Sequence, residues 1–228
     1  MEKPLAVLFD IDGTLISSGG AGGESWRRAF DELYGIPADI GKHTDTGMTD
    51  PDVGRLTFLG VLGREPTPEE MARLMTKRHE HLPDAVAESE GYRVLPGVEQ
   101  TLERLRDAGF LLGLTTGGTE TAAHMKLERG GLNRFFSFGG YGSDSPDRAE
   151  LTRRAIERAG EILKHPLDPQ QALVVGDTPL DIEAANAAGA VAVGVATGHY
   201  SEDDLRRAGA DYVVKTLEEE LPGVASDA

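Results

Sequence analysis

Short runs of consecutive apolar residues, each leading into a segment with helical spacing, limit this chain to a fold of alternating strands and helices. The first run covers residues 5–9 and ends at Asp10, and later runs cover residues 110–114, 135–138, 172–175, 191–195 and, more weakly, 212–214. Segments 98–108, 119–129, 148–159 and 179–188 carry apolar residues at helical spacing. Runs that are apolar on both faces are typical of parallel strands buried between helices. The pattern predicts an α/β fold with a doubly wound parallel sheet, a Rossmann-like core.

The segment between the first two apolar runs is too long for a connection from a strand to a helix. Its apolar residues have helical spacing at 26–34, 51–62 and 68–82. Connections in compact domains are mostly a few residues long. We therefore predict an inserted all-helical cap domain at residues 17–92, and a core domain formed by residues 1–16 and 93–228. The glycine-rich stretch at 17–23 is expected to be a flexible entry to the cap, with a plain surface loop as the alternative.

The charge balance and the absence of cysteine exclude several functions. The chain has 39 acidic and 23 basic residues, a formal net charge of -16, and no cysteine. A nucleic acid polymer or an anionic membrane is not an expected partner, because binding to either needs concentrated lysine and arginine. Disulfides, zinc-thiolate sites and thiol nucleophiles are excluded. No stretch has the length of a membrane span or a signal peptide, so we expect a cytoplasmic protein, either a monomer or a homodimer.

The motif FDIDGT places two carboxylates, Asp10 and Asp12, directly after the first predicted strand. Ligands in open α/β sheets bind beyond the carboxyl ends of the strands, and Gly13 permits a tight turn there. Two neighbouring carboxylates repel each other and an incoming phosphate unless a cation lies among them. The motif therefore indicates a hard divalent metal, for which carboxylate oxygens are suitable ligands.

A second acidic motif, GDTPLD, follows the predicted strand at 172–175. Asp177 lies at the strand end, Asp181 lies one turn into the next helix, and the threonine and proline between them fit the N-cap and first helical positions. If the two strands are neighbours, these carboxylates join Asp10 and Asp12 in one cluster of oxygen ligands for Mg2+. Helix capping by Asp177 and Asp181 is the alternative.

A third strand end carries the motif LTTGGT. The hydroxyl of Thr115 or Thr116 and the backbone N–H groups of Gly117 and Gly118 are candidates for binding phosphate oxygens at the start of the next helix. An ordinary turn between strand and helix is the alternative.

In this order, with a cap-sized insertion after the first of them, the three motifs resemble those of the haloacid dehalogenase superfamily, in particular its capped phosphatases of the phosphoglycolate phosphatase and β-phosphoglucomutase type. The resemblance implies that Asp10 is the nucleophile, which forms an aspartyl-phosphate, and that Asp12 is the general acid and then the general base. It also implies Mg2+ bound by Asp10, Asp177 and the backbone carbonyl of Asp12. Asp181 would be an outer or water-mediated ligand, and Thr116 would hydrogen-bond the transferred phosphoryl group. For Asp12 to hold a proton its pKa must be raised, which a crowded acidic site can achieve.

A further motif of that superfamily is a basic residue, usually lysine, and this sequence departs from the superfamily pattern at that position. Arg148 lies where the lysine is expected, whereas Lys164 is too close to the next strand. Arginine can hold phosphate oxygens with its planar fork of donors, so we predict that Arg148 takes this role. A surface charge paired with Asp147 or Glu150 is the alternative.

Residues of the cap are expected to choose the substrate, because a lid contributes groups to a site when it closes. The candidates are His43, Thr44 and Thr49, in the polar loop GKHTDTGMTDP, and a place on the surface is the alternative for His43. The aromatic residues of segment 26–34 recur at helical spacing and are expected in the core of the cap.

Together these motifs predict a Mg2+-dependent phosphatase that hydrolyses a small phosphorylated metabolite through an aspartyl-phosphate on Asp10. Two alternatives remain. A phosphomutase would transfer the phosphoryl group to a sugar hydroxyl instead of water. A catalytically silent binding module would keep the fold without turnover, which is disfavoured because a silent protein has no need of four mutually repelling carboxylates.

Overall fold

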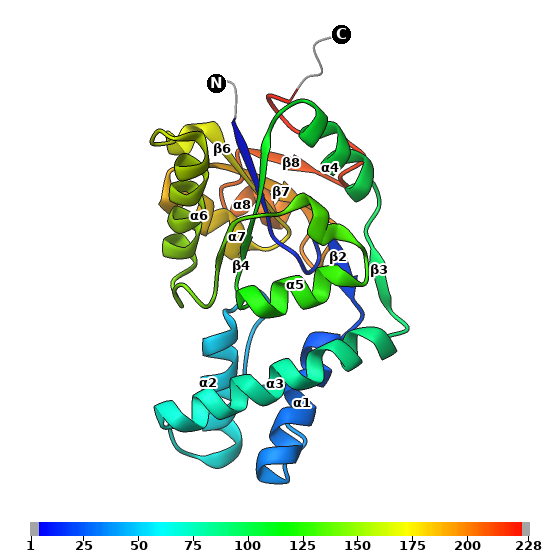
Figure 1. The fold of residues 1–228 in the computed structure, drawn as a ribbon, viewed down its shortest axis with the longest axis vertical. Helices are drawn as coiled ribbons and strands as arrows, with labels where there is room; N and C mark the ends of the chain where they lie inside the picture. The colour runs from blue at the N-terminus through cyan, green and yellow to red at the C-terminus, as the bar shows by residue number, and fades with distance from the viewer. Residues whose placement is uncertain (1–4, 225–228) are drawn as a thin grey trace.

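Six strands form one parallel sheet at the centre of the fold (Figure 1). The computed structural model describes residues 5–224, and the order of the strands is β5-β4-β1-β6-β7-β8. They are β1 (Ala6–Phe9), β4 (Leu111–Thr116), β5 (Gly139–Tyr141), β6 (Ala172–Gly176), β7 (Val191–Val195) and β8 (Tyr212–Val214). Each neighbouring pair is parallel, so the predicted doubly wound α/β fold is confirmed.

Strand β1 lies inside the sheet, and the chain winds away from it in both directions. Its pairing places Phe9 beside Leu114 of β4 and beside Val175 of β6. The carboxyl ends of these three strands therefore meet at one edge, where the direction of winding changes. The motifs FDIDGT, LTTGGT and GDTPLD follow these three ends.

Helices cover both faces of the sheet. On one face lie α4 (Val98–Asp107) and α5 (Glu120–Glu128), and on the other lie α6 (Arg148–Leu163), α7 (Pro179–Ala188) and α8 (Glu202–Arg207) (Figure 1). Val7 and Phe9 belong to the apolar cluster with α4 and α5, whereas Ala6 and Leu8 belong to the cluster with α6, α7 and α8. This double burial explains why β1 is apolar on both faces. The connections contain the 3-10 helices η1 (Ile40–Lys42), η2 (Leu132–Phe135) and η3 (Pro169–Gln171).

Three α-helices between residues 18 and 92 form a helical cap with its own apolar core. They are α1 (Ala21–Tyr34), α2 (Asp50–Leu62) and α3 (Pro68–Glu88), and they lie together at the bottom of Figure 1, below the sheet. Trp26, Phe30, Phe58 and Leu74 are buried between them. The predicted helical cap, with the aromatic residues of segment 26–34 in its core, is therefore confirmed.

Two short antiparallel strands, β2 (Ile16–Ser18) and β3 (Tyr92–Val94), connect the core to the cap. The boundaries predicted for the cap fall within these strands, and residues 1–4 and 225–228 of the predicted core domain lie outside the described residues. Within residues 5–224, no helix combines the length and the apolar character needed to cross a membrane.

The glycine-rich stretch at 17–23 is mostly regular secondary structure instead of a flexible entry to the cap. Ser17 and Ser18 pair with β3, and α1 begins at Ala21. Gly19 and Gly20 form the turn between them, and both have a positive φ that glycine adopts without strain. Glycine content alone predicted flexibility, but pairing with a distant segment orders this stretch.

The predicted strand at 135–138 was placed too early in the chain. Phe135 ends η2, and β5 begins at Gly139. An apolar run alone does not separate a strand from another buried segment. The strand itself reads GGY, because α6 packs so closely that a Cβ on Gly140 would lie 1.8 Å from the carbonyl oxygen of Leu151. Glycine is disfavoured in strands, so this packing removes the usual sequence signal.

Candidate active site

Three aspartates meet at the carboxyl edge of the sheet. Asp10 follows β1, Asp177 follows β6, and Asp181 lies in the first turn of α7. One carboxylate oxygen from each lies within 4.8 Å of the other two, and all three residues are buried. Strands β1 and β6 are neighbours, which is the condition on which the predicted shared cluster depended.

Burial and mutual repulsion perturb the ionisation of this cluster. Burial, followed by the charge of Asp181, raises the pKa of Asp10 well above its usual value and raises the pKa of Asp177 to about 8. The charge of Arg148 opposes part of the shift at Asp10. Crowded carboxylate oxygens that repel one another are suited to a hard divalent cation. Asp10 and Asp177 therefore fit the ligand set expected for Mg2+.

Glycines leave space around the carboxylate of Asp177. A Cβ on Gly198 would lie 1.7 Å from Asp177 Oδ2, and a Cβ on Gly13 would lie 2.3 Å from the same oxygen. The hydroxyl of Thr197 donates to the carbonyl of Gly13 over 2.5 Å. The loop after β7 is thus a further part of the site that motif analysis missed. Its signal in the sequence was the pair TG shortly after the apolar run at 191–195.

Asp181 both caps a helix and belongs to the acidic cluster. Its Oδ2 accepts hydrogen bonds from the backbone N–H and the hydroxyl of Thr178, at 3.1 and 2.7 Å, and this capping box begins α7. Its Oδ1 accepts a hydrogen bond from Arg148. Capping, the alternative considered for Asp181, is therefore present together with a place beside Asp10.

Arg148 lies within the acidic cluster. It is the first residue of α6, and its side chain is 11% exposed. Nη2 forms an ion pair with Asp181 and lies 3.8 Å from Asp10 Oδ1, while Nη1 donates to the carbonyl of Gly47 over 2.7 Å. The carboxylate of Asp147 instead accepts hydrogen bonds from backbone N–H groups of its own helix. The surface ion pair considered as the alternative for Arg148 is absent from the described residues.

Asp12 lies outside the three-aspartate cluster and bonds to Lys126 of α5. Nζ of Lys126 lies 2.5 Å from Asp12 Oδ2, and Oδ1 has no hydrogen-bond partner among the described residues. Burial acts to raise the pKa of Asp12, but the charge and hydrogen bond of Lys126, with smaller contributions from Ser18 and Arg78, together outweigh burial and lower it. The raised pKa expected for Asp12 is therefore wrong for this arrangement, because the neighbour that decides its ionisation is a cation. Its carboxylate does not join the group that could hold a metal.

Lys126 is a charged residue at the site that motif analysis missed. It is 8% exposed and lies on α5 with the buried residues Ala122, Ala123 and Leu127. Lysine is almost never fully buried without a partner, so a lysine on a core-facing side of a helix is itself a signal. The sequence alone does not show which side of α5 is buried, so the unusual position of Lys126 could be recognised only in the structure.

The motif LTTGGT separates its two threonines. Thr115 Oγ1 lies 3.1 Å from Thr152 Oγ1, so the side chain of Thr115 points towards α6. Successive side chains of a strand point to opposite faces, so the hydroxyl of Thr116 is the one available to the site. Thr116 ends β4, and its Oγ1 accepts a hydrogen bond from the N–H of Gly118 at 3.3 Å. Of the two threonines left open, the geometry thus favours Thr116.

The cap contacts this turn through Asp50, the first residue of α2. The N–H of Asp50 donates to the carbonyl of Gly117 over 2.7 Å, and its Oδ2 accepts from the N–H of Thr119 at 2.8 Å. Two residues of α3 add to the contact: Nη1 of Arg78 lies 2.9 Å from Asp50 Oδ2, and Nε2 of His79 lies 2.8 Å from Thr119 Oγ1. A carboxylate is favoured at the start of a helix, so Asp50 holds the cap against the start of α5.

Of the cap residues predicted to contact the substrate, Thr49 and His43 lie in different places. Thr49 is buried at the start of α2, donates to Asp52 Oδ2 over 3.2 Å, and lines a cavity of about 390 Å³ together with Arg148. His43 packs within the cap, since a Cβ on Gly60 of α2 would lie 2.2 Å from its Nδ1. The structure brings Thr49 close to the site and leaves His43 away from it.

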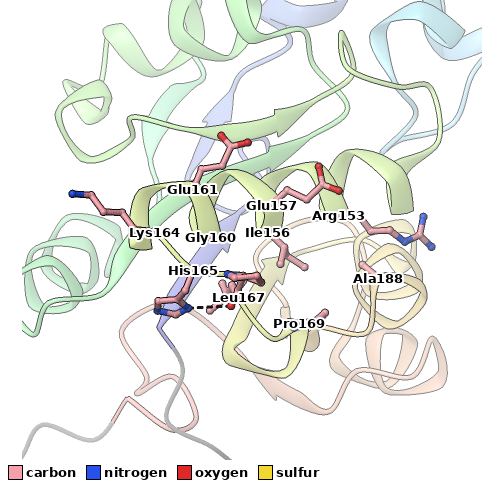
Figure 2. Close-up of a pocket in the computed structure, with 11 residues that line it drawn as sticks. Arg153, Ile156, Glu157, Gly160, Glu161, Lys164, His165, Leu167, Pro169 and Ala188 are labelled. Atoms are coloured by element: carbon pink, nitrogen blue, oxygen red, sulfur yellow. Dashed lines mark hydrogen bonds between the residues drawn. The ribbon is translucent and has the colours of Figure 1, made fainter.

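Two other cavities help to locate the substrate. One, of about 470 Å³, is lined by Asp12, Asp177, Thr46, Arg93, Thr197 and His199 and so lies beside the acidic cluster. Another, of about 660 Å³, lies along the second half of α6, where Lys164, His165 and Leu167 line it (Figure 2). None of the motif aspartates lines this second cavity. The cavity beside Asp12 is therefore the better candidate for the leaving group of a substrate.

Comparisons with known proteins agree with this arrangement. The model of the haloacid dehalogenase-like hydrolase family matches residues 4–189. A phosphoglycolate phosphatase of Pseudomonas putida is 31% identical over 232 residues, which cover 99% of this chain and 81% of the relative. The pyrophosphatase PpaX of Bacillus pumilus is 28% identical over 225 residues, which cover 97% of this chain and 96% of the relative. A solved structure of a predicted phosphoglycolate phosphatase from Haemophilus somnus has the same fold, with a TM-score of 0.73, 21% identity and coverage of 96% of each chain.

Proposed function

This chain belongs to the haloacid dehalogenase-like hydrolases and is a phosphatase, and we propose that it hydrolyses a small phosphorylated metabolite through an aspartyl-phosphate on Asp10. The observation that carries the proposal is the cluster of Asp10 with Asp177, Asp181 and the guanidinium of Arg148. Phosphoryl transfer depends on a positioned nucleophile and on fixed positive charge around the phosphate oxygens. One buried cluster thus contains the proposed nucleophile, oxygen ligands for a metal, and the positive charge of the Arg148 guanidinium.

The proposed reaction has two steps. First, a carboxylate oxygen of Asp10 attacks phosphorus, and the bond between phosphorus and the ester oxygen breaks. The leaving oxygen keeps the bonding electron pair and takes a proton from Asp12, so that an alcohol departs. Second, water attacks phosphorus and gives a proton to Asp12 while the bond between phosphorus and Asp10 breaks. Phosphate is released, and both aspartates return to their starting states.

Asp12 can act as the acid in this scheme only after its contact with Lys126 changes. In the present arrangement that contact lowers the pKa of Asp12, which favours the carboxylate form. We propose that Asp12 turns from Lys126 towards the leaving oxygen when substrate binds and takes up a proton from solvent as it does so. Its Oδ1, which has no hydrogen-bond partner among the described residues, is the atom available for that contact.

Asp10, Asp177 and the backbone carbonyl of Asp12 would hold Mg2+, with Asp181 as an outer ligand. The raised pKa of Asp177, about 8, and the closeness of its carboxylate to those of Asp10 and Asp181 support this assignment. The pairing of Asp181 with Arg148 fits an outer position. When bound, the ion would neutralise phosphate charge and keep Asp10 ionised.

The phosphate would be bound by Thr116, by backbone N–H groups of Gly117 and Gly118, and by Arg148. The hydroxyl of Thr116 lies at the end of β4, next to the strand that presents Asp10. Arginine donors form a rigid fork that matches phosphate oxygens. Among cap residues, Thr49 is the stronger candidate for substrate contact. His43 would contribute only if its loop moved away from α2.

The substrate class follows from the size of the site and from the relatives. The cavity beside Asp12 has a volume of about 470 Å³, which suits a small metabolite. The names of the two relatives refer to pyrophosphate and phosphoglycolate, small molecules in which the leaving group is itself an anion. We therefore propose a small phosphate ester or anhydride as the substrate.

Phosphate release from a panel of small phosphate esters, measured with Mg2+ and with a chelator, tests the proposal. Release that needs Mg2+ and falls by about 1,000-fold or more in Asp10→Asn is the expected result, because that substitution removes the nucleophile. Asp107→Asn removes an exposed carboxylate that pairs with Arg106 on the surface, and it should leave release unchanged. Full activity in Asp10→Asn would overturn the nucleophile assignment. An isomeric sugar phosphate in place of free phosphate would show a mutase.

A further inference from the structure

One residue of the cap, Asp50, bonds to two successive peptide groups of the turn after β4 that is proposed to bind phosphate. Its N–H donates to the carbonyl of Gly117 over 2.7 Å, and its Oδ2 accepts from the N–H of Thr119 at 2.8 Å. The carbonyl and the N–H of a trans peptide group point in opposite directions. Because the Gly117 carbonyl faces Asp50, the N–H of Gly118 points away from the cap and reaches the hydroxyl of Thr116 over 3.3 Å.

The core of the protein fixes one part of this turn and the cap fixes another. Glycine has more conformational freedom than any other residue, so a turn built from Gly117 and Gly118 depends on such bonds for its shape. The core supplies the bond from the N–H of Gly142 to the carbonyl of Gly118, at 2.8 Å. The cap supplies the bond from Asp50 to the carbonyl of Gly117, and a Cβ on Gly117 would lie 2.6 Å from the carbonyl oxygen of Met48. The shape of the turn therefore depends on the position of the cap.

Arg78 of α3 holds the carboxylate of Asp50 in place. Its Nη1 lies 2.9 Å from Asp50 Oδ2, the same oxygen that accepts from Thr119, and its guanidinium lies over the ring of Trp26 at 5.2 Å. The side chains of Arg78 and Asp50 are 1% and 10% exposed, and charges buried to this extent are costly unless they are paired. Because Trp26 belongs to the apolar core of the cap, the carboxylate of Asp50 is fixed relative to the cap as a whole.

The same segment of the cap also contacts the other group proposed to bind phosphate, Arg148. Nη1 of Arg148 donates to the carbonyl of Gly47 over 2.7 Å, while Asp50, one turn further along the chain, bonds to the glycine turn. Segment 47–50 therefore has contacts with the guanidinium at one end and with the turn at the other. Both phosphate-binding groups take part of their orientation from the cap.

We propose that Asp50 is a positioning residue, which gives the turn after β4 its phosphate-binding shape while the cap lies on the core. This inference rests on the proposed phosphatase function and adds that a cap residue completes the phosphate site without contacting phosphate. By linkage, docking of this segment and binding of phosphate strengthen each other by the same factor. The negative charge of Asp50 alone would disfavour an anion nearby, so its place beside this turn is explained by its hydrogen bonds.

Binding of inorganic phosphate, measured by calorimetry with Mg2+ present, tests the inference without turnover. Asp50→Ala should raise the Kd for phosphate by about 5- to 150-fold, the usual range of coupling between two sites. Asp50→Asn keeps an oxygen that can accept from the N–H of Thr119, so it should raise the Kd by a smaller factor. Asp31→Ala removes an exposed carboxylate of α1 and, as the matched control, should leave the Kd unchanged.

The direction of the change separates positioning from charge. If Asp50 acted through its charge alone, Asp50→Ala and Asp50→Asn would both bind phosphate more tightly than the unaltered protein. Phosphate binding that is unchanged or tighter in Asp50→Ala would overturn this inference and leave the proposed function intact. An unaltered protein that binds no phosphate and releases none from esters would overturn the proposed function, and this inference with it.

Hydrogen exchange of the unaltered protein gives a second test that needs no variant. The amides of Asp50 and Thr119 bond between the cap and the core, whereas the amide of Met71 bonds within the cap to the carbonyl of Thr67. Phosphate with Mg2+ should slow exchange of the first two amides and leave that of Met71 unchanged. A contact that serves only to stabilise the cap would exchange at the same rate with and without phosphate. Equal rates at Asp50 and Thr119 would therefore overturn the inference even if Asp50→Ala does not fold.

Discussion

Nη2 of Arg148 lies 3.8 Å from Oδ1 of Asp10, and the same guanidinium pairs with Asp181 and donates to the carbonyl of Gly47. These three contacts come from the end of β1, the start of α7 and the loop that leads into α2. The donors of arginine form a rigid planar fork, so the contacts are held at the same time. One side chain therefore connects the proposed nucleophile with the position of the cap.

Arg148→Met should lower kcat/KM for phosphate esters by about 100-fold or more, the usual effect of removing one charged donor from a transition state. Arg148→Lys should lower it by a smaller factor, because lysine keeps the charge but cannot hold Asp181 and the Gly47 carbonyl with one fork. Steady-state kinetics with a saturating metal concentration give both values. Kinetics of Arg148→Met equal to those of the unaltered protein would show that the guanidinium has only a structural role.

Asp12→Asn should impair poor leaving groups more than good ones. An alkyl alcohol needs a proton as it departs, so the variant should lose about 100- to 10,000-fold with alkyl phosphates. Nitrophenolate departs without a proton, so the loss with p-nitrophenyl phosphate should be much smaller. Comparison of kcat for the two substrates measures the difference. Equal losses would contradict the role of Asp12 as general acid and would indicate that it acts on the nucleophile or the metal instead.

The elements that could be predicted from the sequence are those whose signal is local. The central strands are continuous apolar runs, and α7 begins as expected, with Thr178 at the N-cap and Pro179 in the first turn. Strands β2 and β3 were not predicted, because each has three residues and their pairing joins Ser17 to Arg93 across the whole cap. Such a pairing depends on tertiary structure and leaves no periodic pattern in either segment.

In the candidate site, too, the features with a local sequence signal were predicted and those that depend on tertiary structure were not. Asp10 and Asp177 were predicted to meet because parallel strands align their carboxyl ends, and the structure places them together. The contact between Lys126 and Asp12 depends on the rotation of α5, and the closeness of Gly198 to Asp177 depends on the path of a loop. Neither property is encoded by residue type at a fixed spacing. The ionisation of Asp12 was predicted in the wrong direction for this reason.

Burial of His79, whose ring lies against Thr119 at the start of α5, should make the stability of the protein depend on pH. Burial, together with the charge of Arg78, lowers the pKa of His79 below 6.5, while Asp50 opposes the shift. The unfolded chain therefore binds a proton more readily than the folded protein between the two pKa values. This contribution to stability is fully present above pH 6.5 and decreases as the pH falls through 6.5 towards the lower, folded-state pKa.

Thermal unfolding between pH 5 and 8 measures this effect. His79→Gln keeps an amide that can bond to Thr119 but does not titrate, so its unfolding temperature should fall less on acidification than that of the unaltered protein. His165→Gln is the control, because His165 is exposed and its ring bonds only to the neighbouring carbonyl of Pro166 among the described residues. Identical pH profiles for His79→Gln and the unaltered protein would contradict the prediction.

Mg2+ should stabilise the folded protein through Asp10 and Asp177. Their pKa values are raised by burial and by Asp181, so a divalent cation relieves a repulsion that exists only in the folded state. At a concentration 100 times the dissociation constant, the stabilisation is about 2.7 kcal/mol. For a chain of this size that raises the unfolding temperature by about 5 to 10 °C. Calorimetry with Mg2+ and with a chelator measures the shift. Asp177→Asn should lose most of it, and Asp107→Asn should keep it. A shift of the same size in Asp177→Asn would place the ion elsewhere on this acidic chain.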